Sequence, residues 1–280
     1  MKFLGVIDGH DIEELTNTFN KVKDMEGPIF IHIKTQKGKG YSFAEKDQEK
    51  FHGISPFDMK TGSIPSKTKT YSSILGEEMV KLGEEDENIY VISAGMVKGT
   101  GLGEFFEKFP KRAVDVGIAE GHAVTFAGGL ASMGKKPYVA IYSTFMQRGF
   151  SQLIHDISIQ KLPVRFIIDR AGIVGEDGKT HNGLYDISIF TTIPNYTVIA
   201  PTTCNELIEA LEISKDFDDG PIAIRIPREI SFSLENDEKF QIGKWKEIKK
   251  GEKTLFIATG SMLKEILSID EQLKSKKIDG

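Results

Sequence analysis

The chain has 280 residues, of which 39% are hydrophobic and 28 are glycines, enough for one large domain or two ordinary ones with a hydrophobic core. Its 36 basic and 41 acidic residues give a net charge of −5, which argues against general nucleic-acid or membrane-surface binding, because both need a basic face. The single cysteine, Cys204, precludes an intrachain disulfide and favours a reducing compartment. No apolar run approaches the ~18 residues of a membrane span. The apolar run within the first ten residues is too short for a secretory signal. We therefore predict a cytoplasmic globular protein.

Residues 1–67 resemble the end of one α/β domain followed by a linker. The pattern predicts a helix over 11–25, a turn at Gly27-Pro28 and a buried strand over 29–34. The polar stretch 35–69 has little periodicity, and a segment of this length without structure is usually a linker or a functional loop.

Residues 68–232 alternate between β-branched runs and segments of helical period. Strands are expected at 89–93, 113–116, 137–142, 164–169, 197–200 and 222–226, and helices near 101–109, 119–133, 143–161 and 204–216. This alternation requires crossover connections, so it predicts a doubly wound α/β domain whose parallel sheet is covered on both faces.

Residues 233–280 are read as a linker followed by the start of a third domain. A strand over 254–260 and a helix over 261–274 are expected there. A single βα unit cannot bury its own apolar face, so we expect this domain to be truncated and both ends of the chain to be cut.

Two glycine-rich segments follow predicted strands, at 95–101 and 37–40. Neither has the Gly-Lys-Ser/Thr ending of a P-loop or the spacing of a dinucleotide-binding fingerprint. By spacing alone, both are interpreted as ordinary loops.

The segment 115–130, DVGIAEGHAVTFAGGL, places Glu120 in the first turn of a helix otherwise built from small and apolar residues. One interpretation is an acid favoured there by the helix dipole. The other is a carboxylate held in an apolar setting so that it can share a proton with a ligand nitrogen. The residues alone leave both open. Four alanines at four-residue spacing would also let another backbone approach closely: Ala119, Ala123, Ala127 and Ala131.

The segment 140–148 passes from a strand into a helix, and open α/β sheets bind ligands at the carboxyl ends of their strands. Tyr142, Phe145 and Arg148 leave the strand at that edge, although aromatic residues there are also common in cores. The adjacent His155 and Asp156 point about 100° apart on a helix, so they are interpreted as structural and not as metal ligands.

The loop 169–181 combines Arg170, Asp177 and His181 with three glycines. This composition suits a site for a phosphorylated polyol, and an ordinary solvated loop is the alternative. Arg228, after the last strand, supplies a further guanidinium group.

Together these segments resemble the transketolase superfamily, and within it the 1-deoxy-D-xylulose-5-phosphate synthase family. The strongest stretches are VDVGIAEGHAVTFAGGLA, VAIYSTFMQRGFSQLIHDISIQKLPV, IDRAGIVGEDGKTHNG, AIRIPRE and, upstream, HIKTQKGKGYSFAEKDQEKFHG. The resemblance runs through nearly the whole chain and implies a thiamine diphosphate and Mg²⁺ enzyme that joins pyruvate to D-glyceraldehyde 3-phosphate with loss of carbon dioxide. That reaction feeds isoprenoid, thiamine and pyridoxal synthesis.

The resemblance also implies roles for individual residues in binding the cofactor. Glu120 would bind N1′ of the aminopyrimidine and be catalytic, and Phe145 would stack on that ring. Ile118 would hold the cofactor in its bent shape, Met96 would line the thiazolium pocket, and Lys37 would lie in a basic loop facing the cofactor.

For the substrates, the resemblance makes His52 a catalytic residue that handles protons near the reacting carbon. Arg170 and Arg228 would clamp the phosphate of the acceptor, as bidentate guanidinium groups do well. The remaining substrate-binding residues would be Tyr142, Arg148, Asp177 and His181.

The sequence departs from this family at two places. Gly121 stands where many relatives carry a larger polar residue, and no Gly-Asp-Gly motif, which holds Mg²⁺ and the diphosphate in such enzymes, occurs in the sequence. We therefore assign 1–67 to the remnant of a diphosphate-binding domain, 68–232 to the pyrimidine-binding domain and 233–280 to the truncated C-terminal domain. No residue of the chain is assigned to the metal, whose ligands are expected in a missing N-terminal segment.

By itself the chain is expected to be inactive or nearly so, and to work as a homodimer, through the alanine-rich helix and its neighbours, or with a complementing N-terminal chain. Alternatives are the pyrimidine-binding subunit of a split transketolase or of a 2-oxoacid dehydrogenase, and a non-catalytic fragment.

Overall fold

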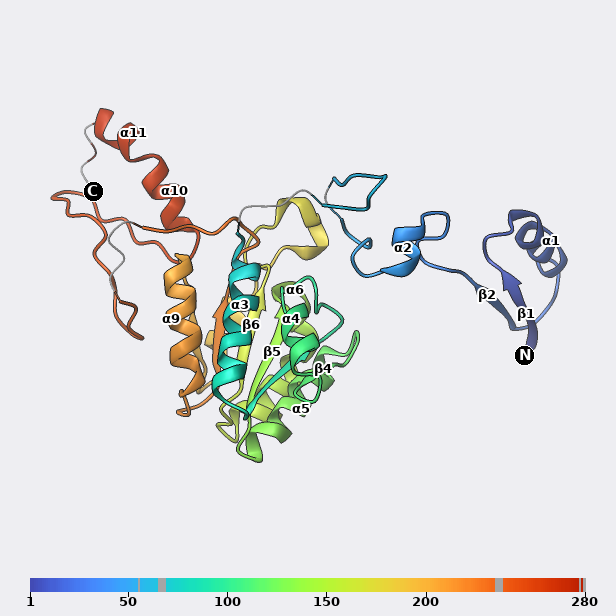
Figure 1. Ribbon diagram of the computed structural model, residues 1–280, viewed down its shortest axis with the longest axis horizontal. Helices are drawn as coiled ribbons and strands as arrows, with labels where there is room; N and C mark the ends of the chain where they lie inside the picture. The colour runs from blue at the N-terminus through green and yellow to red at the C-terminus, as the bar shows by residue number, and fades with distance from the viewer. Residues whose placement is uncertain (55, 65–68, 235–238, 277, 279–280) are drawn as a thin grey trace. The chain divides into compact units, whose positions relative to one another are not determined.

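The computed structural model describes residues 1–54, 56–64, 69–234, 239–276 and 278. The chain divides into two compact units, Met1–Ser66 and Lys67–Gly280, each of which is described by itself (Figure 1). No helix in the described ranges has both the length and the apolar character needed to cross a membrane.

The first unit is a βαβ arrangement with a short additional helix. Two parallel strands pair with each other, and Asp11 caps the helix between them by accepting a hydrogen bond from the Glu14 amide at 2.9 Å. The elements are β1 (Lys2–Asp8), α1 (Ile12–Val22), β2 (Ile29–Lys34) and α2 (Ser42–Lys46).

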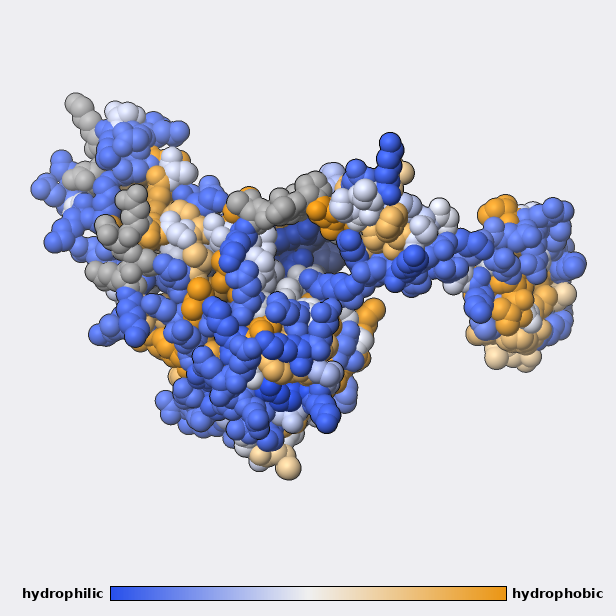
Figure 2. Space-filling view, in the orientation of Figure 1, coloured by the Kyte–Doolittle hydropathy of each residue, from blue (hydrophilic) through white to orange (hydrophobic). Residues whose placement is uncertain are grey.

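The prediction of a buried strand over 29–34 is half right. The strand exists, but none of its residues is fully buried, because only β1 pairs with it in this unit. Phe3, Val6 and Phe30 are 60%, 59% and 48% exposed, and hydrophobic residues gather on the surface of this unit (Figure 2). The strand β1 was not predicted, because Gly5 interrupts its apolar run.

The second unit is built on a sheet of six parallel strands in the order β4-β3-β5-β6-β8-β7. This confirms the predicted doubly wound α/β fold, and each predicted strand in 68–232 forms within two residues of its expected bounds. The strands are β3 (Ile89–Ser93), β4 (Ala113–Asp115), β5 (Lys136–Tyr142), β6 (Arg165–Asp169), β7 (Thr197–Ile199) and β8 (Ile222–Arg225).

Helices cover both faces of this sheet and form two separate hydrophobic cores (Figure 1). Successive residues of a strand point to opposite faces, so Tyr138 and Ala140 of β5 join one core while Val139 and Ile141 join the other. The first core contains residues of α3 (Tyr71–Glu85), α4 (Gly103–Lys108) and α9 (Cys204–Lys215), and the second those of α5 (Glu120–Ser132) and α8 (Asp186–Thr192).

The helix α3 was not predicted, because Gly76 and Gly83 lower its helix propensity. Both glycines are sites of close contact: a Cβ at Gly76 would overlap the carbonyl oxygen of Gly101, and one at Gly83 would lie 2.6 Å from the Phe105 ring. The close packing of α3 against the segment after β3 therefore requires glycine at these two positions, and the same glycines weaken the helical pattern in the sequence.

The prediction of a helix near 143–161 is confirmed in part: residues 143–158 are helical without a break, but the type of helix changes along them. That segment is a succession of short helical turns, and a Cβ at Gly149 would lie 2.7 Å from Met146 and 3.1 Å from Val124 of α5, so tight packing occurs where the helix type changes. The turns are α6 (Ser143–Met146), the 3₁₀ turn η1 (Gln147–Gly149), α7 (Phe150–Gln152) and the π turn η2 (Leu153–Ser158). Such π turns are frequent near functional sites.

The strand predicted over 254–260 does not form in the described residues. Leu255 and Ile257 are 82% and 65% exposed, and no strand pairs with this segment. The helix predicted after it forms as two pieces, α10 (Met262–Ser268) and α11 (Asp270–Ser275).

Candidate active site

The site lies where the direction of strand connections reverses. From β3 the chain passes through α4 to β4 on one side, then returns through α5 to β5 on the other side of β3. At such a point the loops after neighbouring strands diverge and leave a crevice at the carboxyl edge. Ten of the predicted site residues lie at or after the carboxyl ends of strands of this sheet: Met96 after β3, Ile118 and Glu120 after β4, Tyr142 at the end of β5 with Phe145 and Arg148 after it, Arg170, Asp177 and His181 after β6, and Arg228 after β8.

Glu120 is the first residue of α5 and is 3% exposed. The Arg148 Nη1 atom donates a hydrogen bond to its Oε1 at 2.8 Å, and the Arg148 side chain is 52% exposed. A buried carboxylate needs a partner of this kind, because an unpaired buried charge is strongly unfavourable. The first turn of α5 thus carries an acid that is shielded from water and paired with a half-exposed cation.

Three rings meet beside this ion pair. The rings of Tyr142 and Phe145 stack with centroids 5.8 Å apart, and His181 lies edge-on to Phe145 at 5.4 Å. The Arg148 guanidinium lies over Phe145, 5.2 Å from its centroid. Phe145 is half-buried and packs against the second core, so it belongs both to the core and to the site. The carboxyl end of β5 and the loop after β6 are therefore brought together.

Arg170 has a φ of 58°, a left-handed conformation that residues other than glycine seldom adopt. Its Nη1 atom donates to the Gly99 carbonyl at 2.6 Å and to Asp169 Oδ2 at 2.7 Å. Its guanidinium lies over the Tyr142 ring, 4.2 Å from the centroid. Arg170 thus joins the loop after β3 to the carboxyl ends of β5 and β6.

The Asp177 carboxylate lies between two arginines. One of its oxygens is 3.5 Å from Arg170 Nε, and the other forms an ion pair with Arg228. The two arginines predicted to clamp a phosphate therefore converge on one internal anion.

Asp169, Ser72 and Asp115 also hold this site together, and sequence reasoning assigned a role to none of them. Asp169 is completely buried, and burial raises the pKa of its carboxyl while the neighbouring Arg170 opposes that rise. Asp115 accepts hydrogen bonds from the Gly95 and Gly117 amides at 2.7 and 2.9 Å, so it ties together the loops after β3 and β4. Acids at strand ends were the available signal, but two of their partners, Ser72 and Gly95, are distant from them in sequence.

Two predicted residues lie at the margin of this edge. Met96 is half-buried, its amide donates to Ser93 Oγ at 3.1 Å, and Ile118 is 81% exposed. At Gly121, an added Cβ would lie 3.2 Å from the flexible Gln152 side chain.

The alanine stripe of α5 faces the interior of its own unit. Ala123, Ala127 and Ala131 belong to the second core, and a Cβ at Gly128 would lie 3.2 Å from the Asp156 carbonyl oxygen. The segment that follows β5 thus makes a close approach to this helix.

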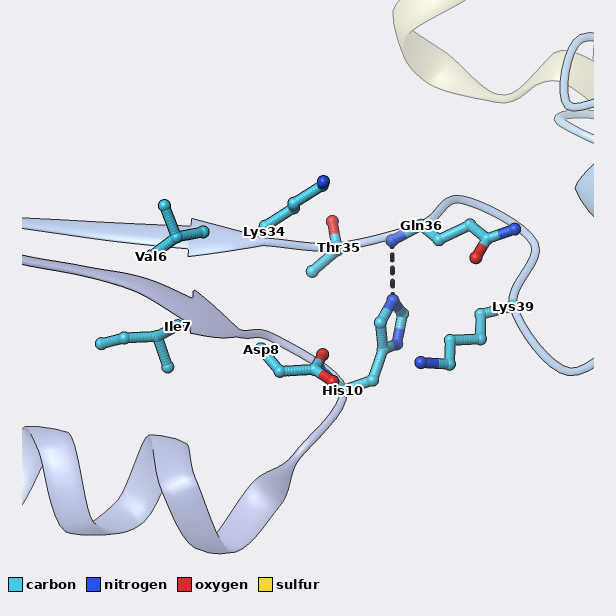
Figure 3. Close-up of a pocket in the computed structure, with 8 residues that line it drawn as sticks. All are labelled: Val6, Ile7, Asp8, His10, Lys34, Thr35, Gln36 and Lys39. Atoms are coloured by element: carbon cyan, nitrogen blue, oxygen red, sulfur yellow. Dashed lines mark hydrogen bonds between the residues drawn. The ribbon is translucent and has the colours of Figure 1, made fainter.

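Lys37 and His52 belong to the first unit, and both are exposed there. That unit contains a pocket of about 380 Å³ at the carboxyl ends of β1 and β2, where His10 Nε2 accepts a hydrogen bond from the Gln36 amide at 2.7 Å (Figure 3). The pocket is lined by Val6, Ile7, Asp8, His10, Lys34, Thr35, Gln36 and Lys39. In the described part of the chain, no group of three or more His, Cys, Asp or Glu residues is arranged to hold a metal ion.

Comparison with known families gives two matches. Residues 67–231 match the family described as "Transketolase, pyrimidine binding domain", and residues 1–35 match the one described as "1-deoxy-D-xylulose-5-phosphate synthase".

Curated relatives carry the name 1-deoxy-D-xylulose-5-phosphate synthase. The protein of Fusobacterium nucleatum is 60% identical over 99% of this chain and 46% of its own length. That of Clostridium acetobutylicum is 49% identical over 100% of this chain and 46% of its own. The chain therefore spans about half the length of the curated relatives it matches.

Solved structures show the same fold. A protein described as "Split gene transketolase, inactive beta4 tetramer" has a TM-score of 0.67 and 26% identity over 76% of this chain and 69% of its own. Transketolase from Campylobacter jejuni has a TM-score of 0.61 and 17% identity over 98% of this chain and 54% of its own, a likeness of fold alone.

Proposed function

Because the chain belongs to the transketolase pyrimidine-binding domain family, we propose that its second unit is the pyrimidine-binding part of a 1-deoxy-D-xylulose-5-phosphate synthase. Such an enzyme condenses pyruvate with D-glyceraldehyde 3-phosphate and releases carbon dioxide. The observation that carries the proposal is Glu120, a buried acid at the start of α5 beside an aromatic ring.

The residues around Glu120 suit the aminopyrimidine of thiamine diphosphate. A buried carboxylate can share a proton with a ring nitrogen, and the half-buried Phe145 offers a planar apolar surface for stacking. When bound, the cofactor supplies a carbon nucleophile that adds to the pyruvate carbonyl. In this proposal Glu120 holds the N1′ proton, Phe145 orients the ring, and Met96 and Ile118 line the side toward the thiazolium.

The arginines after β6 and β8 suit a phosphorylated acceptor. Arg170 and Arg228 already converge on the Asp177 carboxylate, so the same two groups can receive phosphate oxygens when Asp177 moves aside. Tyr142, Arg148 and His181 border the same edge and would contact the oxygens of pyruvate and of the acceptor.

For the first unit we propose that Lys37 belongs to a basic loop that faces the cofactor and that His52 handles protons near the reacting carbon. We propose the domain division 1–67, 68–232 and 233–280. The sequence has no Gly-Asp-Gly, so the proposal assigns Mg²⁺ and the diphosphate to residues outside these 280. The working form would then be a cytoplasmic homodimer or a pair with a complementing chain.

A second candidate is a subunit of a two-chain transketolase. The likeness to the split gene transketolase, which covers 69% of that chain, favours it. The two candidates differ in donor: a synthase takes pyruvate and releases carbon dioxide, whereas a transketolase takes a ketose phosphate and releases none.

The test uses the full chain with pyruvate, D-glyceraldehyde 3-phosphate, Mg²⁺ and thiamine diphosphate, with and without a separately made N-terminal segment that carries Gly-Asp-Gly. Carbon dioxide and the five-carbon product are followed. We expect product only with the added segment, and none from Glu120→Gln.

The matched control is Glu78→Gln, because Glu78 is 4% exposed and pairs with a half-exposed lysine of its own helix, away from the strand ends. Equal activity of Glu120→Gln and wild type would refute the role of Glu120. Turnover of a ketose phosphate without carbon dioxide would favour the transketolase.

A further inference from the structure

A completely buried carboxylate stands at the carboxyl end of the central strand β6. Asp169 is 0% exposed and pairs in register with Tyr142 of β5. A charge in that position is unfavourable unless its oxygens are all engaged, so its hydrogen bonds show what it does.

Both carboxylate oxygens of Asp169 accept hydrogen bonds, and two of these three bonds come from Arg170. Oδ1 accepts from the Arg170 amide at 2.6 Å, and Oδ2 accepts from Arg170 Nη1 at 2.7 Å. Ser72 Oγ of α3, 97 positions away, donates to Oδ2 at 3.1 Å. The Asp169 carboxylate therefore binds both the backbone and the side chain of Arg170, and Ser72 of α3 holds this carboxylate in place.

Arg170 needs such support because its backbone is left-handed. Strained backbone of this kind persists only where the surroundings determine it, and it is concentrated at functional sites. Its Nη1 edge is occupied by Asp169 and the Gly99 carbonyl, so the Nε edge is turned toward Asp177, the anion shared with Arg228.

We propose that Asp169, supported by Ser72, is a positioning residue that fixes Arg170 so that its Nε edge faces a phosphorylated substrate beside Arg228. The substrate class rests on the proposed function, whereas the positioning of Arg170 rests on the contacts alone. Asp169 touches no substrate in this arrangement and acts only through Arg170.

The first readout is the reactivity of Arg170 toward phenylglyoxal, followed by mass spectrometry of the full chain. Asp169→Asn is expected to raise the rate of Arg170 modification about tenfold, and Ser72→Ala, which removes one hydrogen bond and leaves the ion pair, about threefold. Asp186→Asn is the matched control, because Asp186 is 2% exposed and pairs at 2.8 Å with Arg225, outside this cluster. It should leave Arg170 reactivity unchanged.

The second readout is binding of inorganic phosphate and D-glyceraldehyde 3-phosphate by calorimetry. Wild type and Asp186→Asn should bind alike, and Asp169→Asn about tenfold more weakly. In the complemented enzyme, Asp169→Asn should raise KM for D-glyceraldehyde 3-phosphate while kcat/KM for unphosphorylated D-glyceraldehyde is retained.

An unchanged Arg170 modification rate in both Asp169→Asn and Ser72→Ala would overturn the positioning role, and Ser72→Ala serves if Asp169→Asn does not fold. A faster rate with no phosphate binding by wild type would keep the positioning role and refute the phosphorylated substrate of the proposed function.

Discussion

Replacing Arg148 by methionine isolates the ion pair at the start of α5. Methionine keeps much of the side-chain length and its contact with Phe145, but it removes the only cation that the structure places on the Glu120 carboxylate among the described residues. Glu120 would then be a buried acid without an opposite charge.

The magnitude follows from the burial of the two partners. Breaking a fully buried pair costs roughly 3–5 kcal/mol, and an exposed pair contributes roughly 0–1 kcal/mol. Glu120 is 3% exposed but the Arg148 side chain is 52% exposed, so water can replace part of the lost contact. We expect the free energy of unfolding to fall by about 2 kcal/mol, which for a unit of this size is a Tm lower by roughly 4–8 °C.

The assay is thermal and urea unfolding of the full chain at pH 7 in a double-mutant cycle with Glu120→Gln. A neutral amide needs no cation, so Arg148→Met in the Glu120→Gln background should be nearly neutral. The control is Lys69→Met, which breaks a surface pair whose side chains are 65% and 50% exposed, and it should change little. An Arg148→Met loss no larger than that of Lys69→Met, or equal losses in both backgrounds, would refute the reasoning.

Two further predictions concern stability at the ends of the sheet. Burial is the largest single influence and acts to raise the pKa of Asp86 and to lower that of Lys136. Hydrogen bonds and opposite charges together outweigh it, from Lys136 and Asn88 for Asp86 and from Asp86 and Asp216 for Lys136, so the Asp86 pKa lies below 3.8 and the Lys136 pKa above 10.5. At pH values between these two pKa values, Lys136→Met should therefore lower the free energy of unfolding by about 1 kcal/mol. The difference from wild type in urea unfolding should vanish as the pH falls through the folded pKa of Asp86 or rises through that of Lys136. Gly99→Ala should lower the free energy of unfolding by about 1–3 kcal/mol, because the added Cβ would overlap the Tyr142 hydroxyl. Gly103→Ala, whose Cβ would meet no atom within 4 Å, should show an unchanged or slightly higher Tm.

Much of the second unit could be predicted from local pattern. Buried strands of a parallel sheet are short apolar runs, so β3, β5 and β6 stood out, and their alternation with helices predicted a doubly wound sheet. Local pattern failed where packing overrode propensity. The glycines of α3 conceal a helix, and an apolar run over 254–260 forms no strand because no neighbour pairs with it.

The candidate site divides in the same way. The sequence by itself determined which groups stand at strand ends, including Glu120, Arg170 and Arg228, because a strand end is a local property. Only the tertiary structure decided that β8 lies between β6 and β7, that Arg148 covers Glu120, and that Ser72 reaches Asp169 across 97 positions. Strand order and the partners of buried charges depend on contacts between distant segments, which exist only once the crossovers have closed and water has been excluded.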